Sequence, residues 1–295
     1  MFLVPRLVQA VSMRLLMILG TLVGLLGAGA ALALNFPLPP PEAVASFQGD
    51  AKRGAYLARL SGCIACHSSK SGEPWAGGNP LKSKFGTFYA PNITPDKEHG
   101  IGGWTFEQFV RAVLQGVSTS VKPYYPAFPY DFYASLTDRD MADLWAAMKA
   151  IPPAPQASRP HELGFPFSVR DGLRLWRPLF ERADMTASEP DKGGSWNVGR
   201  YLVMGPAHCA ACHMPRNLAG GLNDSDGLAG DPRMLDGGKS PALTAEALRA
   251  RGWTKENLIT ALRTGVLPNG DAFGGSMTEV VQESTAFLLT SHLED

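Results

Sequence analysis

The sequence predicts an all-α protein in which two small helical domains stand in tandem behind an N-terminal transmembrane helix. Three observations support this fold class: an uncharged apolar run near the N-terminus, an internal repeat that covers most of the chain, and apolar residues at helical spacing within the repeat. No segment shows a convincing strand alternation. The length of 295 residues suits about two domains of ordinary size.

The apolar run occupies residues 15–34. Its twenty residues, at about 1.5 Å each, cover a bilayer core of roughly 30 Å. Arg6 and Arg14 precede the run, and basic residues keep their end of a span in the cytoplasm. A cleaved signal peptide is the alternative, because small residues lie near Ala31. The length of the run and the proline-rich stretch 37–41 favour an uncleaved anchor, and both interpretations export the rest of the chain.

Two segments repeat one another at an offset of 145 to 150 residues. Four landmarks occur in the same order in both copies, which indicates internal duplication. The pairs are Gly54-Ala55-Tyr56-Leu57 with Gly199-Arg200-Tyr201-Leu202, Ala90-Pro91-Asn92-Ile93-Thr94 with Ser240-Pro241-Ala242-Leu243-Thr244, Gly103-Trp104-Thr105 with Gly252-Trp253-Thr254, and Gly116-Val117 with Gly265-Val266.

The repeated unit is predicted to be helical. Thr105 is a suitable N-cap, Gln108 completes a capping box, and Gly116 closes the first helix. A second helix is predicted from near Thr137 to the residue before Pro152-Pro153. The apolar residues at helical spacing are Phe106, Phe109, Val110, Val113 and Leu114 in the first helix, and Met141, Leu144, Trp145 and Met148 in the second.

These landmarks divide the chain into four parts. Residues 1–41 form the anchor or signal with its linker, 42–151 the first domain, 152–194 a proline-rich connector, and 195–295 the second domain. The connector carries too much apolar surface for a free tether, so we expect it to pack across both domains. Its large apolar residues are Phe165, Phe167, Trp176, Leu179 and Phe180.

All four cysteines of the chain fall within two Cys-x-x-Cys-His motifs. The motifs are Cys63-Ile64-Ala65-Cys66-His67 and Cys209-Ala210-Ala211-Cys212-His213. Two disulfides are the ordinary expectation for four cysteines in an exported protein. Because each pair is followed directly by histidine and no cysteine is left over, we instead expect two covalently bound haem c groups.

The spacing of the motif suits haem attachment on a helix. Residues three and four apart share a face, so both thiols can reach one porphyrin edge while the adjacent histidine turns toward the iron. His67 and His213 are therefore the expected iron ligands. A structural zinc site needs four protein ligands, whereas each cluster offers three. A thioredoxin-like motif needs a βαβ context that the sequence lacks.

In the second repeat, Met277 is the expected ligand on the other side of the iron. It lies in a glycine-rich stretch 64 residues beyond His213, and a methionine sulfur opposite histidine raises the potential of the haem. Met234 is the rival ligand. The alternative role for Met277 is that of a loop methionine packed on the core.

The first repeat has no methionine at the equivalent position. Gly116 to Phe128 and Gly265 to Met277 both span twelve positions, so Phe128 stands where the methionine is expected. Phenylalanine cannot bind iron. The first iron is therefore either five-coordinate or bound by a residue from outside this loop, unless the two loops differ in length.

Other ligands for the first iron are few. Met141 and Met148 lie on the apolar face of a predicted helix, where core packing is expected. His161 and Met185 in the connector are the remaining candidates. Among the other histidines, we expect His99 and His292 on the surface and His208 beside the second haem.

The 27 basic and 27 acidic residues cancel, which argues against nucleic acid as a partner.

The sequence resembles the multihaem cytochrome c subunits of bacterial membrane-bound dehydrogenases for alcohol, fructose and gluconate, and the cytochrome subunits of molybdenum hydroxylases. The resemblance covers nearly everything from residue 50 onward. It is carried by Pro91-Asn92-Ile93-Thr94-Pro95, Gly100-Ile101-Gly102-Gly103-Trp104, Tyr125-Pro126-Ala127-Phe128-Pro129-Tyr130, and the stretch from Gly205-Pro206-Ala207-His208 through Pro215-Arg216-Asn217.

This resemblance implies two tandem class I cytochrome c-like domains. Haem attachment is implied at Cys63, Cys66, Cys209 and Cys212, with His67 and His213 as proximal ligands. Many relatives carry a third haem domain that this chain lacks. The repeat also predicts a last helix, matching 138–151, where the chain stops at Asp295, so we expect either a truncated chain or a less stable second domain.

The resemblance also implies a function and its partners. We expect a non-catalytic electron-transfer subunit that accepts electrons from a dehydrogenase catalytic subunit and passes them to quinone or a terminal oxidase. It would lie on the periplasmic side of the bacterial inner membrane, anchored by residues 15–34. The alternatives are a haem enzyme and a small-molecule-binding sensor, both using an open iron in the first repeat.

Overall fold

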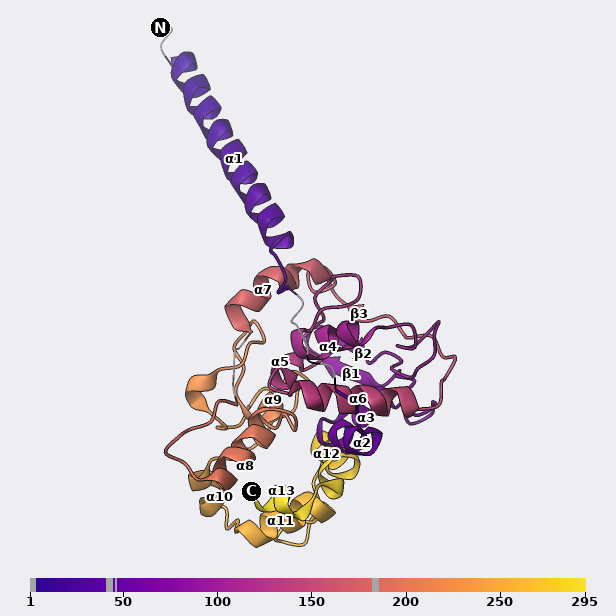
Figure 1. Cartoon of the computed structure of the whole chain (residues 1–295). Helices are drawn as coiled ribbons and strands as arrows, with labels where there is room; N and C mark the ends of the chain where they lie inside the picture. Colours follow the sequence, from indigo (N-terminus) through magenta and orange to yellow (C-terminus); the bar gives the residue numbers. More distant parts are fainter. Residues whose placement is uncertain (1–3, 41–44, 46, 182–185) are drawn as a thin grey trace.

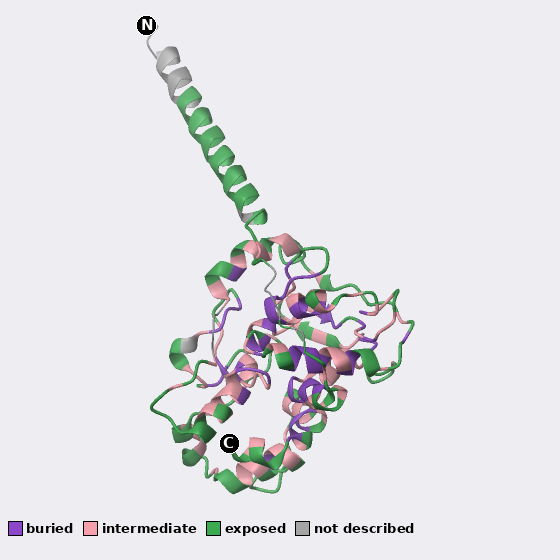
Figure 2. Cartoon of the chain, in the orientation of Figure 1, coloured by how far each residue is buried: buried purple, intermediate pink, exposed green. Residues whose placement is uncertain are grey.

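The computed structural model describes residues 4–40, 45, 47–181 and 186–295. The first helix, α1 (Val4–Leu34), projects alone from the globular part of the molecule (Figure 1). Its segment Met13–Leu32, with a mean hydropathy of 2.2, is the one helix within the described ranges that is long and apolar enough to cross a membrane. It is exposed along this length, whereas buried residues are confined to the globular part (Figure 2). The predicted apolar helix is therefore present, and its composition fits an anchor or a signal sequence.

The first repeat contains the two predicted helices, α4 (Phe106–Gln115) and α6 (Asp138–Ala150). It also contains α2 (Ala51–Leu60), α3 (Cys63–His67), which carries the first motif, and α5 (Tyr130–Tyr133). Thr105 and Gln108 form the predicted capping box of α4, and Gly116 ends that helix in the left-handed region at φ 59°. Thr137 caps α6 in the same way.

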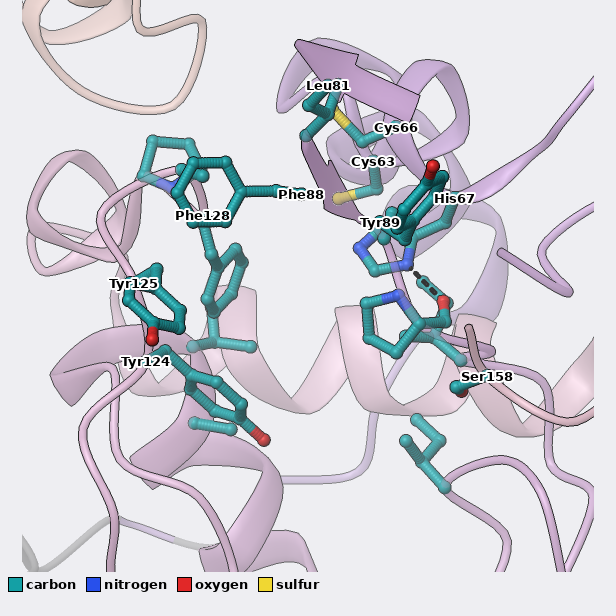
Figure 3. A pocket seen from close by; sticks show the side chains of 18 of the residues that line it. Cys63, Cys66, His67, Leu81, Phe88, Tyr89, Tyr124, Tyr125, Phe128 and Ser158 are labelled. Atoms are coloured by element: carbon teal, nitrogen blue, oxygen red, sulfur yellow. Dashed lines mark hydrogen bonds between the residues drawn. The ribbon is translucent and has the colours of Figure 1, made fainter. Parts of the chain in front are cut away.

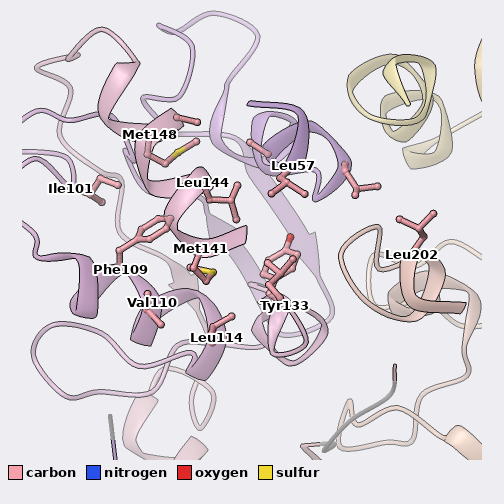
Figure 4. Close-up of a cluster of buried hydrophobic side chains, with 14 of the residues drawn as sticks. Leu57, Ile101, Phe109, Val110, Leu114, Tyr133, Met141, Leu144, Met148 and Leu202 are labelled. Carbon is pink, nitrogen blue, oxygen red and sulfur yellow. The ribbon is translucent and has the colours of Figure 1, made fainter. Parts of the chain in front are cut away.

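Helices α2 and α6 pack closely and carry the main core. Arg53 on α2 forms ion pairs with Asp140 and Asp143 on α6. The buried apolar side chains of the core lie around this helix pair and α4, and Leu202 joins them from α8 (Gly194–Met204) of the second repeat (Figure 4). They include Leu57, Leu60, Ile101, Phe109, Val110, Leu114, Tyr133, Met141, Leu144 and Met148. Met141 and Met148 are thus core residues, as their helical spacing predicted.

A small antiparallel sheet corrects the all-α prediction. Strands β1 (Pro80–Ser83), β2 (Gly86–Tyr89) and β3 (Glu162–Leu163) lie in the order β1-β2-β3. Strands of four and two residues are too short to produce a readable alternation. The pairing of β2 with β3 also joins the first repeat to the connector, a contact that local sequence does not encode. The fold is otherwise mostly helical.

The connector contains a 3₁₀ turn, η1 (Arg170–Gly172), followed by α7 (Leu173–Phe180). Arg177 on α7 donates hydrogen bonds to the carbonyl oxygens of Gln115 and Gly116 at the end of α4. The indole nitrogen of the adjacent Trp176 donates to the carbonyl oxygen of Ala219. Helix α7 therefore contacts both repeats.

The second repeat begins with α8 (Gly194–Met204) and α9 (Ala210–His213). It continues through η2 (Asp224–Asp226), α10 (Ala245–Ala250), α11 (Lys255–Thr264), α12 (Ser276–Glu283), η3 (Thr285–Phe287) and α13 (Thr290–Glu294). Helix α11 repeats the construction of α4: Thr254 and Asn257 form its capping box, and Gly265 ends it at φ 80°.

The two repeats lie against one another at several places. The end of the chain folds back onto α2, where the Arg59 guanidinium stacks over the Phe287 ring at 4.0 Å and the Tyr56 hydroxyl bonds His292 at 2.7 Å. His292 is therefore not the free surface residue that we expected. On the other side, Phe132 of α5 is buried in a small cluster with residues of the second repeat, namely Ala210, Met214 and Leu222.

Candidate functional site

The first Cys-x-x-Cys-His motif forms its own short helix, α3, which begins after Gly62 in the left-handed region at φ 63°. Cys63, Cys66 and His67 all line one cavity of about 500 Å³ (Figure 3). Neither these thiols nor those of the second motif form a disulfide. The structure therefore brings the three predicted binding residues of this motif to a single apolar cavity of cofactor size.

His67 is held with one nitrogen available to the cavity. Its Nδ1 lies 2.7 Å from the carbonyl oxygen of Pro91, and because a carbonyl only accepts, Nδ1 carries the proton. Burial lowers the pKa of His67, while the Pro91 bond partly opposes this. The ring is therefore neutral with a free lone pair on Nε2, which is the state that a metal ligand needs.

A glycine closes the loop that follows this histidine. The amide of Gly77 donates to the His67 carbonyl oxygen at 2.8 Å, and Gly77 adopts φ 76°. A Cβ atom there would lie 2.4 Å from the carbonyl oxygen of Ala90. Only glycine therefore lets the Ala90-Pro91 segment approach the histidine closely enough to bond it.

The second motif is built in the same way. His213 at the end of α9 donates from Nδ1 to the carbonyl oxygen of Pro241 at 2.8 Å. The amide of Gly230, at φ 82°, donates to the His213 carbonyl oxygen at 2.8 Å. Burial again lowers the pKa of His213, with the Pro241 bond opposing the shift. Each motif thus presents a neutral imidazole with Nε2 free.

The far wall of the first cavity is aromatic. Phe128 lies across the cavity from His67, with Tyr124 and Tyr125 beside it (Figure 3). The spacing argument had placed Phe128 opposite the histidine, and no ligand atom stands at that position. Met148 also lines the cavity but is part of the buried core.

His161 lines the cavity as well. Its Nδ1 accepts a hydrogen bond from the backbone amide of Tyr89 at 3.2 Å. Because burial lowers its pKa, the ring is neutral and its single proton sits on Nε2. His161 in this state is a hydrogen-bond donor and not an iron ligand. Met185, the other candidate from the connector, lies outside the described residues.

The polar groups of the cavity fit a haem. Nη2 of Arg170 is buried without a hydrogen-bond partner, and Arg170 lines the cavity. A buried guanidinium nitrogen without a partner is costly, and an anionic group such as a haem carboxylate would satisfy it. Together with two thiols and a neutral imidazole on one helix, this donor set suits a covalently held haem. Among the described residues, no group of three or more His, Cys, Asp and Glu side chains is arranged to hold a metal ion directly.

Burial dominates the electrostatics of the four thiols. It raises the pKa of Cys63 to about 12, of Cys66 to about 11 and of Cys209 to about 11, and it raises the pKa of Cys212 as well. Glu279 and Cys212 add to the shift at Cys66. The thiols are therefore protonated and uncharged near neutral pH.

One side chain connects the two motifs directly. His208 immediately precedes Cys209, adopts φ 40°, and places its Nε2 atom 3.3 Å from the carbonyl oxygen of Ser61. The same oxygen accepts a 2.6 Å bond from the Tyr133 hydroxyl. Ser61 stands two residues before Cys63. His208 therefore bonds the segment that precedes the first motif, and it directly precedes the second motif itself.

Met277 lies in a different setting from the one predicted. It occupies the first turn of α12, not a loop, and α12 contacts α3 of the first repeat. Within the part of the chain that the structure describes, no hydrogen bond or cavity brings Met277 together with His213. The rival Met234 lies in a turn closed by its backbone bonds to Gly237 and Gly238.

A second cavity, of about 940 Å³, lies between α8, α11 and α13. Met214, the residue after His213, lines it, but Cys209, Cys212 and His213 do not. The last helix, α13, closes one side. A Cβ on Gly199 of α8 would lie 2.5 Å from the carbonyl oxygen of Asp295, so the end of α13 approaches α8 much as α6 approaches α2.

Sequence reasoning missed several residues that build the site. Pro91 and Pro241 were noted as repeat landmarks, but not as partners of the histidines. Gly77 and Gly230 were not singled out, although an Ala-Gly pair follows each motif and was a usable signal. The Ser61–His208 bond joins residues 147 positions apart, and no sequence signal announces it.

Comparisons with known proteins show which proteins the chain resembles. The chain is 38% identical over 279 residues to a protein named "Diheme cytochrome c-type" from Cereibacter sphaeroides, an alignment that covers 92% of this chain and 93% of that one. It is 40% identical over 247 residues to the gluconate 2-dehydrogenase cytochrome c subunit of Pantoea cypripedii, covering 80% and 56%. It is 38% identical over 247 residues to the cytochrome c subunit of the quinone-dependent alcohol dehydrogenase of Gluconobacter oxydans, covering 79% and 50%. The chain thus spans almost all of the first relative, but about half of the other two. No protein-family model matches the chain.

Proposed function

Because the chain belongs to the family of c-type cytochromes that includes the cytochrome subunits of bacterial gluconate, alcohol and fructose dehydrogenases, we propose that it is a dihaem electron-transfer subunit. Two haem c groups are attached, one through Cys63 and Cys66 and one through Cys209 and Cys212. Each bound haem supplies one-electron redox chemistry at its iron. The two repeats then form tandem cytochrome c domains with the boundaries 42–151 and 195–295.

The contact between the two motifs is the observation that carries this proposal. An electron carrier with two centres needs them close together, because the electron must pass from one to the other. His208 and Ser61 join the segments that lead into the two motifs. This contact supports two attachment sites that lie close together.

The residues around each proposed haem do different work. His67 and His213 supply the proximal nitrogen, and the carbonyl oxygens of Pro91 and Pro241 hold the rings in the binding tautomer. Arg170 supplies a donor to an anionic edge of the first haem. The apolar wall with Phe128 keeps water from that haem. Met277 as the second ligand to the iron at His213 stays a prediction.

We further propose a donor, an acceptor and a place in the cell. The relatives named as dehydrogenase subunits point to a dehydrogenase catalytic subunit as the electron donor. Quinone or a terminal oxidase is the acceptor. The chain works on the periplasmic side of the inner membrane, with α1 as its anchor.

Mass spectrometry of the protein expressed with the haem maturation machinery tests the proposal. We expect a mass increase of two haems in the wild type and of one haem in each of two variants, Cys63→Ser/Cys66→Ser and Cys209→Ser/Cys212→Ser. A colourless protein without added mass would refute the proposal. A single haem in the wild type would refute its dihaem part.

Phe128 favours a second candidate function. With no ligand-forming side chain opposite His67, an iron bound there would have an open position, and an open iron can bind peroxide or a gas. Carbon monoxide added to the reduced protein separates the candidates. No spectral shift would leave the alternative without an open iron, whereas a shift of half the haem together with peroxide turnover would favour the enzyme.

A further inference from the structure

The globular part exposes apolar side chains close to where α1 joins it. Leu175 and Leu179 lie four residues apart on α7, so they share one face of the helix. They are 44% and 64% exposed. The neighbouring faces of α7 are occupied, because Arg177 bonds the end of α4 and Trp176 bonds Ala219. The leucine face is therefore the one that α7 turns away from both repeats.

Arg174 ties this face to the base of α1. Its Nη1 donates to the carbonyl oxygen of Phe36 at 3.1 Å, and its Nη2 donates to the carbonyl oxygen of Val121 at 3.0 Å. Phe36 and Val121 are themselves 37% and 48% exposed. We call Phe36, Val121, Leu175 and Leu179 the apolar patch.

The backbone of Val121 is strained, and burial of the half-exposed side chain offsets little of the energetic cost. It adopts φ 57°, a conformation that is unfavourable for a β-branched residue and ordinary for glycine or asparagine. Such a conformation persists only where the surrounding structure fixes it. Here the Val121 amide donates to the Ser118 carbonyl oxygen at 2.9 Å and the Val121 carbonyl oxygen accepts from Arg174 at 3.0 Å, so the half-exposed side chain is held in one direction.

The position of the apolar patch relative to α1 determines how deep the patch would lie in a bilayer that α1 crosses. The apolar segment of α1 ends at Leu32 and the helix ends at Leu34, only two residues before Phe36. Phe36 therefore lies at most about 10 Å beyond Leu32, with about 3 Å from the two further helical residues and about 7 Å from the two residues after them. The interfacial layer beside the hydrocarbon core is about 5–7 Å thick on each side. With α1 in a bilayer, Phe36 and the α7 segment bonded to it lie at the level of the lipid headgroups. Figure 1 shows α7 beside the base of α1.

We propose that the apolar patch docks on the bilayer surface from which α1 emerges. The four side chains enter the boundary between headgroups and acyl chains, as the apolar face of an interfacial helix does. Lys122, beside Val121, is 53% exposed and lies 3.9 Å from a carboxylate oxygen of Asp171, and its ammonium group is placed to meet lipid phosphates as well. Docking adds a second attachment to α1, so the globular part is held in one orientation on the membrane instead of swinging from a flexible linker.

Photolabelling from within the bilayer tests this proposal. The full-length haem-loaded protein is placed, one copy per disc, in nanodiscs of phosphatidylethanolamine and phosphatidylglycerol with a lipid-soluble aryl diazirine, and labelled peptides are mapped by mass spectrometry. We expect label in α1 and in the peptides that carry Val121 and Leu175–Leu179. The peptide with Leu289, which is 55% exposed beside α13 at the far end from α1, should stay unlabelled (Figure 1). Label in α1 alone, or label in neither segment, would overturn the proposal.

Two variants separate docking from a change of fold. Val121→Asn removes the apolar side chain but suits the left-handed backbone, so its thermal stability should equal or exceed that of the wild type. Leu175→Gln/Leu179→Gln alters only exposed positions. Both variants should lose most of the label in the patch while α1 stays labelled, and the matched control Leu289→Gln should lose none. Unchanged labelling of the patch in both variants would overturn the proposal, because these side chains would then not be what holds the segment at the bilayer.

Discussion

Gly54 on α2 touches the backbone of Asp143 on α6. A Cβ atom at Gly54 would lie 1.8 Å from the Asp143 carbonyl oxygen and 2.9 Å from the Cβ of Ala147. The ion pairs of Arg53 join the same two helices. Burial alone would raise the pKa of Asp143, but the Asp50 amide and Arg53 outweigh this effect and hold the pKa of that carboxyl below its usual range. The close contact between α2 and α6 thus depends on the absence of a side chain at Gly54.

Gly54→Ala should therefore destabilise the protein although alanine favours helices. Overpacking a close contact costs about 1–3 kcal/mol, which outweighs the gain of about 1 kcal/mol in helix propensity. Chemical denaturation of the haem-loaded protein measures the loss. Gly172→Ala is the matched control, because a Cβ there meets open space and its backbone suits alanine. Equal stability of the two variants would show that α2 and α6 are not packed this closely.

Phe128→Met should close the first iron. Phe128 faces His67 across the cavity, so a methionine at this position can place its sulfur on the side opposite the imidazole (Figure 3). We expect less carbon monoxide binding by the reduced protein, a stronger ferric methionine–iron absorption band, and a higher midpoint potential for one haem. Phe128→Leu, which changes size without adding a ligand, should show none of the three. If Phe128→Met behaves like Phe128→Leu, the cavity wall does not stand over the iron.

Local patterns predicted much of the first repeat. The capping box at Thr105, the start of the next helix at Thr137 and the helix end at Gly116 are where the sequence predicted them, because capping depends on side chains within a few residues of the backbone groups that they bond. The equal spacing from Gly116 to Phe128 and from Gly265 to Met277 also predicted where Phe128 stands, and Phe128 lines the cavity. These features depend on short stretches of chain, which a single sequence displays directly.

Long-range contacts could not be predicted in this way. The same spacing argument put Met277 in a loop, but it lies at the start of α12, and α12 packs on α3 of the other repeat. The pairing of Gly86 with Leu163 and the bond between His208 and Ser61 likewise join segments far apart in sequence. Such contacts follow from how the two repeats lie against each other, which no local pattern records.

Asp131→Asn should change how stability depends on pH. Burial raises the pKa of Asp131 from 3.8 to about 6, with Glu181 adding to the shift and Arg216 opposing it. A carboxyl with a raised folded pKa contributes stability that is fully present below pH about 3.8 and is lost as the pH rises through about 6. The asparagine variant does not titrate there, so its melting temperature should match the wild type near pH 4 and exceed it near pH 8.

Thermal melts of the haem-loaded protein at these two pH values give the comparison. Asp191→Asn, at an exposed position, is the control and should leave the difference between the two pH values as in the wild type. If the difference in melting temperature between the wild type and Asp131→Asn is the same at both pH values, Asp131 is solvated in the folded protein.

His208→Ala should slow electron exchange between the two haems without removing either. Nε2 of His208 bonds the Ser61 carbonyl oxygen at 3.3 Å, so a path of covalent bonds and one hydrogen bond runs from Cys63 to Cys209. Alanine removes this link and frees the segment before Cys209 to move. After one haem is reduced by pulse radiolysis, we expect equilibration at least several-fold slower than in the wild type, with both midpoint potentials unchanged. His208→Gln keeps a donor and should recover part of the rate, and His99→Ala should have no effect. Equal rates in His208→Ala and the wild type would show that the electron takes another route between the two sites.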